Sequence, residues 1–287
     1  MVIINTIADT RESILWAKQQ GKKVVLIPTM GFLHDGHLSM VKAARRQDNG
    51  DKEILVVMSI FVNPLQFGPN EDYEKYPRDL TRDASLAEEA GVDLLFAPSV
   101  KEMYPAGGSL TAVQVSRITE VLCGASRPGH FEGVATVVTK LFNIVQPHEA
   151  YFGQKDYQQV AVIRQMVKDL NMPITIRSFP TVRESDGLAL SSRNAYLSSE
   201  ERQQAPILYR ALQEASARIT GGEISPDRIK AAIKQRISEE SNGKIDYVEI
   251  YRADDLSEVE QITVSIVIAL AVHFGTTRLI DNIIVEV

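Results

Sequence analysis

The sequence predicts an α/β fold in which a doubly wound parallel sheet is followed by a smaller α+β domain. Apolar runs of strand length alternate with amphipathic, helix-like segments over residues 1–182. Polar clusters follow several of these runs, at the point where each predicted strand ends. After residue 182 the alternation stops, and long helical patterns precede a group of strand-like segments.

The first predicted domain, residues 1–182, alternates strands with helices. Strands are predicted at 22–27, 53–62, 92–97, 149–152 and 174–179, with a short additional strand at 111–115. Helices are predicted at 9–20 (capped by Asp9 or Thr10), 38–46, 79–90, 134–146 and 157–170. The polar stretch 70–78 is interpreted as a mobile loop over a site. This Rossmann-like pattern brings the carboxyl ends of the strands to one edge, where such sheets bind ligands.

The second predicted domain, residues 183–287, follows a polar junction at 183–195 that contains glycine and serine. Helices are predicted at 199–219 and 225–240, and strands at 246–251, 263–273 and 278–287, with a turn at 275–277. We expect this small α+β domain to close over the site of the first.

Composition narrows the class of protein. The chain of 287 residues has 44% hydrophobic and 24% charged residues, which is typical of a soluble globular protein. The net charge of −6 argues against nucleic acid as a partner. Cys123 is the only cysteine, which favours a reducing, cytoplasmic setting. The sequence shows no signal peptide, and its most apolar stretch, 263–272, is about half the length that spans a bilayer.

The segment 28–37 connects a predicted strand to a predicted helix and carries the strongest functional pattern. It contains glycines at 31 and 36 and histidines at 34 and 37. A glycine-bearing turn that leads into a helix N-terminus is suited to hold phosphate, and two imidazoles add donors for an anion. A capping or packing role for the histidines and a zinc site are the alternatives. The zinc site is the weaker alternative because a third ligand is lacking.

A series of motifs runs through the chain in a fixed order. They are PTMGFLHDGH, FVNPLQFGPNEDYEKYPR, RPGHFEGVATVVTKLFNIVQP, YFGQKDYQQ, LALSSRN, KIDYVEI and RLIDN. The HDGH tetrapeptide resembles the HIGH signature of nucleotidylyl transferases. Together, from about Pro28 to Asn282, the motifs closely resemble the pantothenate synthetase (pantoate–β-alanine ligase) family.

This resemblance implies a ligase that forms a C–N bond in two steps. Pantoate and ATP give pantoyl adenylate and pyrophosphate, and the amine of β-alanine then displaces AMP to give pantothenate. The resemblance also implies Mg²⁺ brought in with ATP, for which we name no protein ligand, a homodimer, and neither a nucleic-acid nor a membrane partner.

The resemblance assigns site residues by position in this sequence. His37, His34 and Lys155 are the catalytic candidates, with His37 at the α-phosphate and Lys155 reaching phosphate. The ATP-binding set is Met30, Gly31, Phe32, Leu33, His34, Asp35, Gly36, His37, Gly153, Gln154, Lys155, Asp156, Val182, Leu190, Ser191, Ser192 and Arg193. Within this set, Gly153 and Asp156 meet the ribose, Val182 and Leu190 contact adenine, and 191–193 bind the triphosphate.

Two glutamines are assigned to the acid substrate. The resemblance implies that Gln66 and Gln159 hold pantoate, and amide side chains suit this role because they can donate to its carboxylate and both donate to and accept from its hydroxyls. Gln66 is also the candidate for β-alanine. Arg127 and His130 are secondary candidates for the pantoate and β-alanine side, and Tyr76 for the lid.

Two other functions remain open at this point. One is a different nucleotidyltransferase, such as a cofactor adenylyltransferase or an aminoacyl-tRNA synthetase; the acidic charge balance counts against tRNA. The other is a non-catalytic nucleotide sensor, against which the full set of phosphate-handling residues counts. A pantoate-dependent pyrophosphate exchange distinguishes these alternatives.

Overall fold

The computed structural model describes residues 1–48, 54–69 and 71–287. These residues divide into two compact units. The first comprises Met1–Val115, Arg127–Gln154 and Val162–Pro180, and the second Ser116–Ser126, Lys155–Ala161 and Thr181–Val287. The second unit thus takes in two short segments that the sequence analysis placed in the first domain. The division at residue 182 and the closure of 183–287 over ATP stay predictions.

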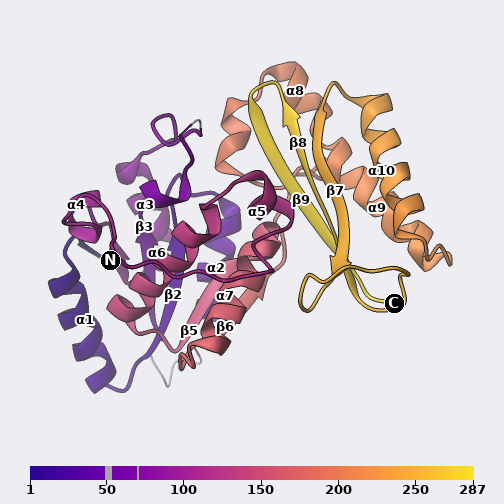
Figure 1. Ribbon diagram of the computed structural model, residues 1–287. Helices are drawn as coiled ribbons and strands as arrows, with labels where there is room; N and C mark the ends of the chain where they lie inside the picture. Colours follow the sequence, from indigo (N-terminus) through magenta and orange to yellow (C-terminus); the bar gives the residue numbers. More distant parts are fainter. Residues whose placement is uncertain (49–53, 70) are drawn as a thin grey trace. The chain divides into compact units, whose positions relative to one another are not determined.

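The first unit is built on a parallel sheet, which confirms the predicted fold class (Figure 1). Its strand order is β1-β4-β3-β2-β5-β6. The strands are β1 (Val2–Ile4), β2 (Lys23–Thr29), β3 (Ile54–Ile60), β4 (Leu94–Phe96), β5 (Glu149–Gly153) and β6 (Thr175–Phe179). The order runs outward from β2 through β3 and β4 on one side and through β5 and β6 on the other. The strand order therefore reverses between β2 and β5. Doubly wound sheets bind ligands at such a reversal.

Strand β2 lies at the centre of the sheet and pairs with β3 and β5. Its residues 24–27 are fully buried. A strand covered on both faces needs apolar side chains on both, which is why this run lacks the alternation of a half-exposed strand. Burying each such aliphatic side chain contributes roughly 1.5–3 kcal/mol.

The helices of the first unit follow the predicted pattern with shifted ends, apart from a short helix at 100–103 that was not predicted. They are α1 (Ile7–Gln19), α2 (Asp35–Arg46), α3 (Leu80–Ala90), α4 (Val100–Met103) and α6 (His130–Val145), and α7 (Tyr157–Asp169) extends into this unit from residue 162. Thr6 caps α1 by accepting from the backbone nitrogen of Asp9, so Asp9 and Thr10 lie inside the helix rather than at its cap. Asp79 caps α3, and Gly91 ends it in the left-handed region with a φ of 100°.

Several sequence-based boundaries were wrong. No strand forms over 111–115, and α6 begins at His130, four residues before its predicted start, because Gly129 turns the chain into the helix with a φ of 82°. The predicted helix 199–219 is broken into α8 (Ser199–Gln204) and α9 (Ile207–Thr220) at Pro206. Proline has no backbone N–H to continue an α-helix, which explains the break. Residue 53 of the predicted strand 53–62 and residue 70 of the predicted loop 70–78 lie outside the described residues.

The second unit combines an antiparallel sheet with helices, as its α+β pattern predicted (Figure 1). The strands β7 (Lys244–Arg252), β8 (Ile266–Phe274) and β9 (Thr277–Val285) pair in that order. Helices α9 and α10 (Pro226–Glu240) pack on this sheet, and α5 (Leu122–Ser126) contacts β7 and β8. The core is aliphatic, with Leu212, Ile233, Ile268 and Leu270 among its fully buried side chains.

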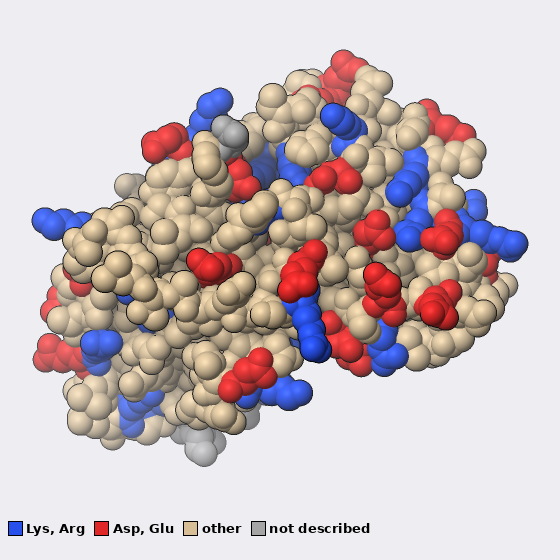
Figure 2. Space-filling model, viewed as in Figure 1, with Lys and Arg blue, Asp and Glu red and all other residues tan. Residues whose placement is uncertain are grey.

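No helix within the described residues is long and apolar enough to cross a membrane. On the face shown in Figure 2, acidic and basic side chains are intermingled rather than gathered by sign.

Candidate active site

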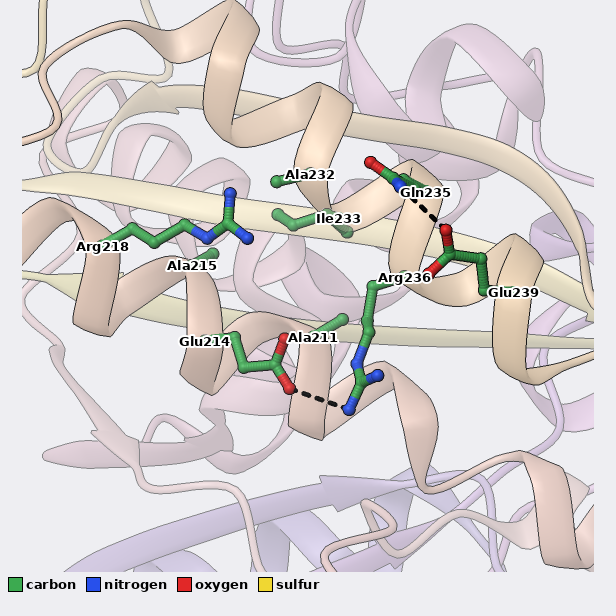
Figure 3. Close-up of a pocket in the computed structure, with 9 residues that line it drawn as sticks. All are labelled: Ala211, Glu214, Ala215, Arg218, Ala232, Ile233, Gln235, Arg236 and Glu239. Carbon is green, nitrogen blue, oxygen red and sulfur yellow. Dashed lines mark hydrogen bonds and ion pairs between the residues drawn. The ribbon is translucent and has the colours of Figure 1, made fainter.

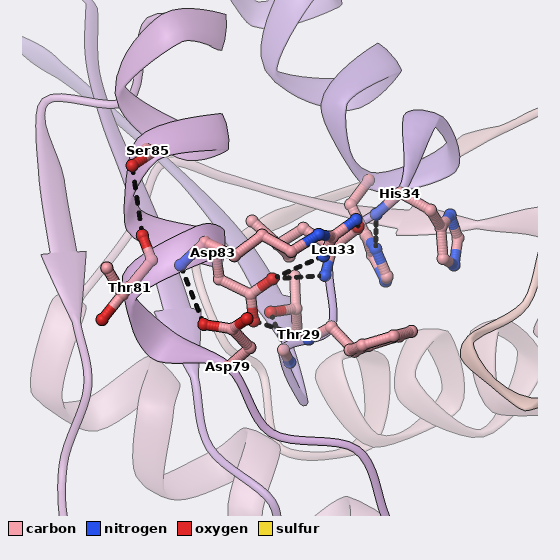
Figure 4. A network of polar contacts seen from close by, with 11 residues as sticks. Thr29, Leu33, His34, Asp79, Thr81, Asp83 and Ser85 are labelled. Carbon is pink, nitrogen blue, oxygen red and sulfur yellow. Dashed lines mark hydrogen bonds and ion pairs between the residues drawn. The ribbon is translucent and has the colours of Figure 1, made fainter. Parts of the chain in front are cut away.

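The turn between β2 and α2 is held by a carboxylate from α3 (Figure 4). Gly31 and Phe32 adopt left-handed conformations, with φ of 84° and 48°. The backbone that follows directs the successive amides of Phe32 and Leu33 toward a common point. That point is occupied by Asp83, whose two oxygens accept from the backbone nitrogens of Phe32 at 2.6 Å and Leu33 at 2.7 Å.

Asp83 is a buried charge with a defined set of partners. Its side chain is 1% exposed. Burial raises the pKa of Asp83 above its ordinary value, and the two backbone hydrogen bonds and Arg82 partly counter that rise. Arg82 lies 3.3 Å from the Asp83 carboxylate and also donates to the carbonyl of Leu33 at 3.0 Å.

This arrangement differs from the expectation that the backbone of the turn would itself hold phosphate. The amides of Phe32 and Leu33 are taken by the protein's own carboxylate. The Leu33 side chain is fully buried in the core beneath the turn. The amide of Gly31 donates to Thr29 Oγ1 at 3.2 Å. An anion that binds at this turn would therefore meet side-chain donors rather than the amides of Phe32 and Leu33.

His34 and His37 form the N-terminal cap of α2. His34 is the N-cap residue, and its Nδ1 accepts from the backbone nitrogen of Gly36 at 3.2 Å. The Nδ1 of His37 in turn accepts from the backbone nitrogen of His34 at 3.3 Å. In a neutral imidazole whose Nδ1 is an acceptor, Nε2 carries the hydrogen. Both rings, whose centroids are 4.0 Å apart, therefore carry an Nε2–H donor.

The glycine of the H-x-G-H motif has a steric reason. A methyl group added at Gly36 would lie 2.8 Å from Cε1 and 2.9 Å from Nδ1 of His34. These distances are too short, so any larger residue at this position forces the His34 ring out of its capping position. The two histidines and the glycine thus depend on one another, while Asp35 between them is exposed.

Gln66 sits on a short helix, η1 (Pro64–Gln66), that is locked against α6. Asn63, fully buried, donates to the carbonyl of Gly133 at 3.0 Å and accepts from the Tyr104 hydroxyl at 2.9 Å. Burial raises the pKa of Tyr104 to about 12, so this hydroxyl stays a donor. A methyl group at Gly133 would lie 2.2 Å from the Leu65 carbonyl oxygen, which explains the glycine there.

Arg127 and His130 hold the backbone of Gln66. The Gln66 carbonyl accepts from Arg127 at 3.2 Å and from His130 Nδ1 at 2.8 Å. Arg127 is always a donor, so its 3.1 Å contact makes His130 Nε2 the acceptor and leaves the ring hydrogen on Nδ1. Arg127 also binds both carboxylate oxygens of Glu71, at 2.6 and 2.5 Å. These two secondary candidates therefore contact the predicted pantoate residue directly.

Gln66 and His130 line a cavity of about 300 Å³ together with Thr111, Glu132 and Thr136. A second cavity, of about 280 Å³, lies beside the turn and is lined by Met30, Gly31 and Asp83 among others. A third, of about 220 Å³, lies between α9 and α10 (Figure 3). Among its lining side chains, Glu214 pairs with Arg236 at 3.1 Å and Gln235 donates to Glu239 at 2.7 Å, and none of the predicted site residues lines it.

The segment after β5 carries the predicted ribose and phosphate residues. Gly153 is the last residue of β5, and η2 (Gln154–Asp156) follows directly. A methyl group at Gly153 would meet no atom within 4 Å, so packing alone does not require glycine there. Asp156 is exposed, and Lys155 Nζ lies 3.9 Å from its carboxylate.

Residues 182–190 form a small hairpin rather than an open junction. The Leu190 nitrogen donates to the Val182 carbonyl at 3.0 Å, and Arg183 pairs with Ala189 across the hairpin. The structure thus brings the two predicted adenine contacts together. Ser191 then caps η3 (Ser192–Tyr196), accepting from the Arg193 nitrogen at 3.3 Å.

Gln159 lies in the first turn of α7 and is half-buried. Its neighbour Gln158 is buried and donates to the carbonyls of Ile118 at 2.8 Å and Val121 at 2.7 Å. Gln158 therefore fastens the 116–126 segment, while Gln159 is the glutamine that retains contact with solvent.

The predicted residues of the first unit follow neighbouring strands. Thr29 at the end of β2 pairs with Ile60 at the end of β3, and β5, which ends at Gly153, is the other neighbour of β2. The turn 30–37 and Gln66 therefore follow the ends of β2 and β3, and Gly153 ends β5, so all of them lie near the point where the strand order reverses.

Sequence reasoning missed the structural roles of Asp83 and of Asp281, whose carboxylate accepts from Arg183 at 2.6 Å. Their bonds join residues far apart in the chain, 50 positions in the case of Leu33 and Asp83. An apolar helical pattern interrupted by an acidic residue on its buried face was the one signal for Asp83. Among the residues that the structure describes, no three His, Cys, Asp or Glu side chains are grouped to hold a metal.

Comparison with known proteins decides the family. The family model for pantoate–β-alanine ligase matches residues 2–284. The chain belongs to the pantoate–β-alanine ligase family. Among its ligase relatives, the pantothenate synthetase of Acetivibrio thermocellus is 59% identical over 100% of both chains. That of Moorella thermoacetica is 57% identical over 100% of this chain and 99% of the relative.

Solved ligase structures agree with the fold. Pantothenate synthetase from Thermus thermophilus has a TM-score of 0.91 at 48% identity, with 99% of each chain covered. Pantoate–β-alanine ligase from Francisella tularensis, solved in complex with "Beta-gamma ATP" and β-alanine, has a TM-score of 0.80 at 36% identity. That comparison covers 99% of this chain and 97% of the other.

Proposed function

We propose that this ligase condenses pantoate with β-alanine at the expense of ATP, through a pantoyl-adenylate intermediate, and releases AMP and pyrophosphate. The observation that carries the proposal is the interlocked pair His34 and His37, whose Nδ1 atoms are used as acceptors within the cap. Each ring is therefore oriented with its Nε2–H as a donor. Family membership and the Francisella complex with a nucleotide and β-alanine support the same substrates.

Adenylation needs a pantoate carboxylate oxygen to attack the α-phosphate while pyrophosphate leaves. Negative charge shifts to the phosphate oxygens and the leaving group, so preoriented donors lower the barrier. We assign His37 to the α-phosphate and His34 to a neighbouring phosphate oxygen. The short rigid cap supports this assignment because neither ring can turn without losing a hydrogen bond that closes α2.

The remaining contacts of ATP are assigned to the segments at 153–156 and 182–193. Gly153 leaves room for the ribose, Asp156 accepts from its hydroxyls, and Lys155 donates to phosphate. Backbone groups of Val182 and Leu190 contact adenine, and Ser191, Ser192 and Arg193 donate to the triphosphate. The Phe32 and Leu33 amides are left out of this set because Asp83 binds them.

Gln66 and Gln159 are assigned to pantoate, and Gln66 also to β-alanine. The support for Gln66 is its fixed backbone, which Arg127 and His130 hold through the carbonyl. A fixed main chain limits the side-chain amide to a small volume, which helps to aim the substrate carboxylate.

Mg²⁺ enters this proposal with ATP. Within the described ranges no acidic or histidine cluster is built for a metal. The ion would therefore be held largely by phosphate oxygens and water, as Mg²⁺ commonly is, and would neutralise their charge. We also propose a cytoplasmic homodimer, and light scattering of the purified chain tests its dimeric state directly.

Product analysis tests the function. Purified protein supplied with ATP, Mg²⁺, pantoate and β-alanine should form pantothenate, AMP and pyrophosphate in equal amounts. His37→Ala should reduce the rate by on the order of a hundredfold, the typical loss for a preoriented donor. Formation of ADP, or no product with pantoate and turnover with an amino acid instead, would reject the proposal.

A further inference from the structure

The RLIDN motif places two adjacent buried polar residues, Asp281 and Asn282, in the middle of β9. They are 3% and 5% exposed. They pair with Leu270 and Ala269 of β8 in the antiparallel ladder, so their backbone is fixed. Burying a carboxylate beside an amide in an aliphatic strand costs free energy unless each group forms hydrogen bonds.

Asp281 fixes the 182–190 hairpin. Its carboxylate oxygens accept from Arg183 Nη1 at 2.6 Å and Nη2 at 2.8 Å, a bidentate pair. Arg183 also donates to the Gly187 carbonyl at 3.1 Å, and its guanidinium lies 3.6 Å from the centroid of the Tyr209 ring. Through Arg183, strand β9 therefore holds the hairpin at both Arg183 and Gly187. Strand β9 also packs against η3.

Asn282 fixes the segment that follows β5. Its Nδ2 donates to the backbone carbonyl of Lys155 at 2.8 Å. Its own backbone nitrogen donates to Asp281 Oδ1 at 2.8 Å, which ties the two side chains into one network. Two adjacent residues of β9 therefore hold the two segments, Asp281 the hairpin and Asn282 the Lys155 main chain.

We propose that Asp281 and Asn282 are positioning residues that hold Lys155 and the 182–193 segment at the spacing that ATP requires. The inference rests on the proposed function, which assigns both segments to ATP. Neither residue touches ATP in this account. Each acts through another, Asp281 through Arg183 and Asn282 through the Lys155 main chain.

The test compares the KM for ATP with the KM for each of the other two substrates. Asp281→Asn and Asn282→Ala should raise the KM for ATP at least tenfold while the KM for pantoate and for β-alanine stays within about twofold. A variant that merely folds less completely lowers kcat and leaves every KM unchanged. Asp246→Asn is the matched control, because Asp246 pairs with Arg278 at 2.8 Å in the same sheet without contacting either segment. Its KM for ATP should match that of the parent protein.

A calorimetric titration with a non-hydrolysable ATP analogue makes the result independent of turnover. Weaker binding of the analogue by both variants, at least tenfold, supports the positioning role even if pantoate proves not to be the substrate. Unchanged binding by Asn282→Ala, which keeps the Asp281–Arg183 pair and is the milder change, overturns it. Equal loss in Asp246→Asn overturns it as well.

Discussion

Asp83 Oδ2 lies 2.6 Å from the backbone nitrogen of Phe32, within the turn that carries the H-x-G-H motif. Two adjacent backbone amides of the turn bind one anion, and that anion is the protein's own carboxylate. This leaves the imidazole Nε2–H groups of His34 and His37 as the principal donors of the turn. The donors that the motif offers are thus mainly side chains rather than backbone amides.

Asp83→Asn should destabilise the fold by about 1–3 kcal/mol, the usual cost of leaving buried donors unsatisfied. An amide presents only one acceptor oxygen, so one of the Phe32 and Leu33 amides loses its partner. Urea denaturation measures the loss. Asp79→Ala removes a carboxylate that caps the same helix and should cost about 1 kcal/mol without affecting the KM for ATP. A loss of stability in Asp83→Asn smaller than that in Asp79→Ala would contradict the role of Asp83 in the turn.

Gly36→Ala should uncouple stability from activity. Alanine favours a helix by roughly 1 kcal/mol over glycine, and this gain opposes the loss of the His34 cap. Global stability should therefore change little. The added methyl group would lie 2.8 Å from the His34 ring, so the ring must move, and we expect at least a tenfold loss of adenylation. Gly108→Ala, whose methyl group meets nothing within 4 Å, is the control. Full activity of the Gly36 variant would show that the His34 cap is dispensable.

Gly133→Ala should weaken the binding of pantoate rather than the binding of ATP. The methyl group would lie 2.2 Å from the Leu65 carbonyl oxygen, and a backbone atom cannot yield as a side chain can. Helix η1 and Gln66 must therefore shift, which should raise the KM for pantoate at least tenfold. The KM for ATP measured on the same sample is the internal control. A rise confined to ATP would place Gln66 elsewhere in the reaction.

The Glu71–Arg127 pair should give a pH-dependent contribution to stability. Burial by itself raises the pKa of Glu71, but the bonds to Arg127 and its charge, together with the backbone of Gly68 and with His130, outweigh burial and hold that pKa below the ordinary 4.5. A lowered carboxyl pKa stabilises the fold above pH 4.5, and this contribution is lost as the pH falls through the lowered value.

Thermal midpoints of the parent and Glu71→Gln, measured from about pH 7 to about pH 3, should therefore converge as the pH falls. A difference that stays constant across this range would show that the charge of Glu71 contributes nothing. Asp83, whose pKa is raised, makes the opposite contribution: it favours the fold below pH 3.8 and loses that effect as the pH rises through its raised pKa.

Apolar periodicity was sufficient to predict the central strands, because β2 and β3 are long and buried on both faces. It could not identify β1, whose Val2–Ile4 span is too short to carry a pattern and is completed by pairing with β4. The break at Pro206 was visible in the sequence, but the apolar positions on either side masked it.

The motifs predicted which residues to examine, but not what each contacts. Local sequence suggested that the turn at 30–37 is suited to hold phosphate, but it did not show that a carboxylate 50 residues away from Leu33 binds the amides of Phe32 and Leu33. The same limit applies to Asp281, whose partner Arg183 lies 98 positions earlier. Such long-range polar pairs depend on the tertiary fold, and a single sequence carries no pattern for them.

Exchange of labelled pyrophosphate into ATP tests the central claim most directly, because it reports adenylate formation without the second substrate. The account predicts exchange that requires pantoate, is absent with amino acids, and falls about a hundredfold in His37→Ala. Exchange that proceeds with an amino acid in place of pantoate, or none with pantoate in a folded and ATP-binding protein, would contradict it.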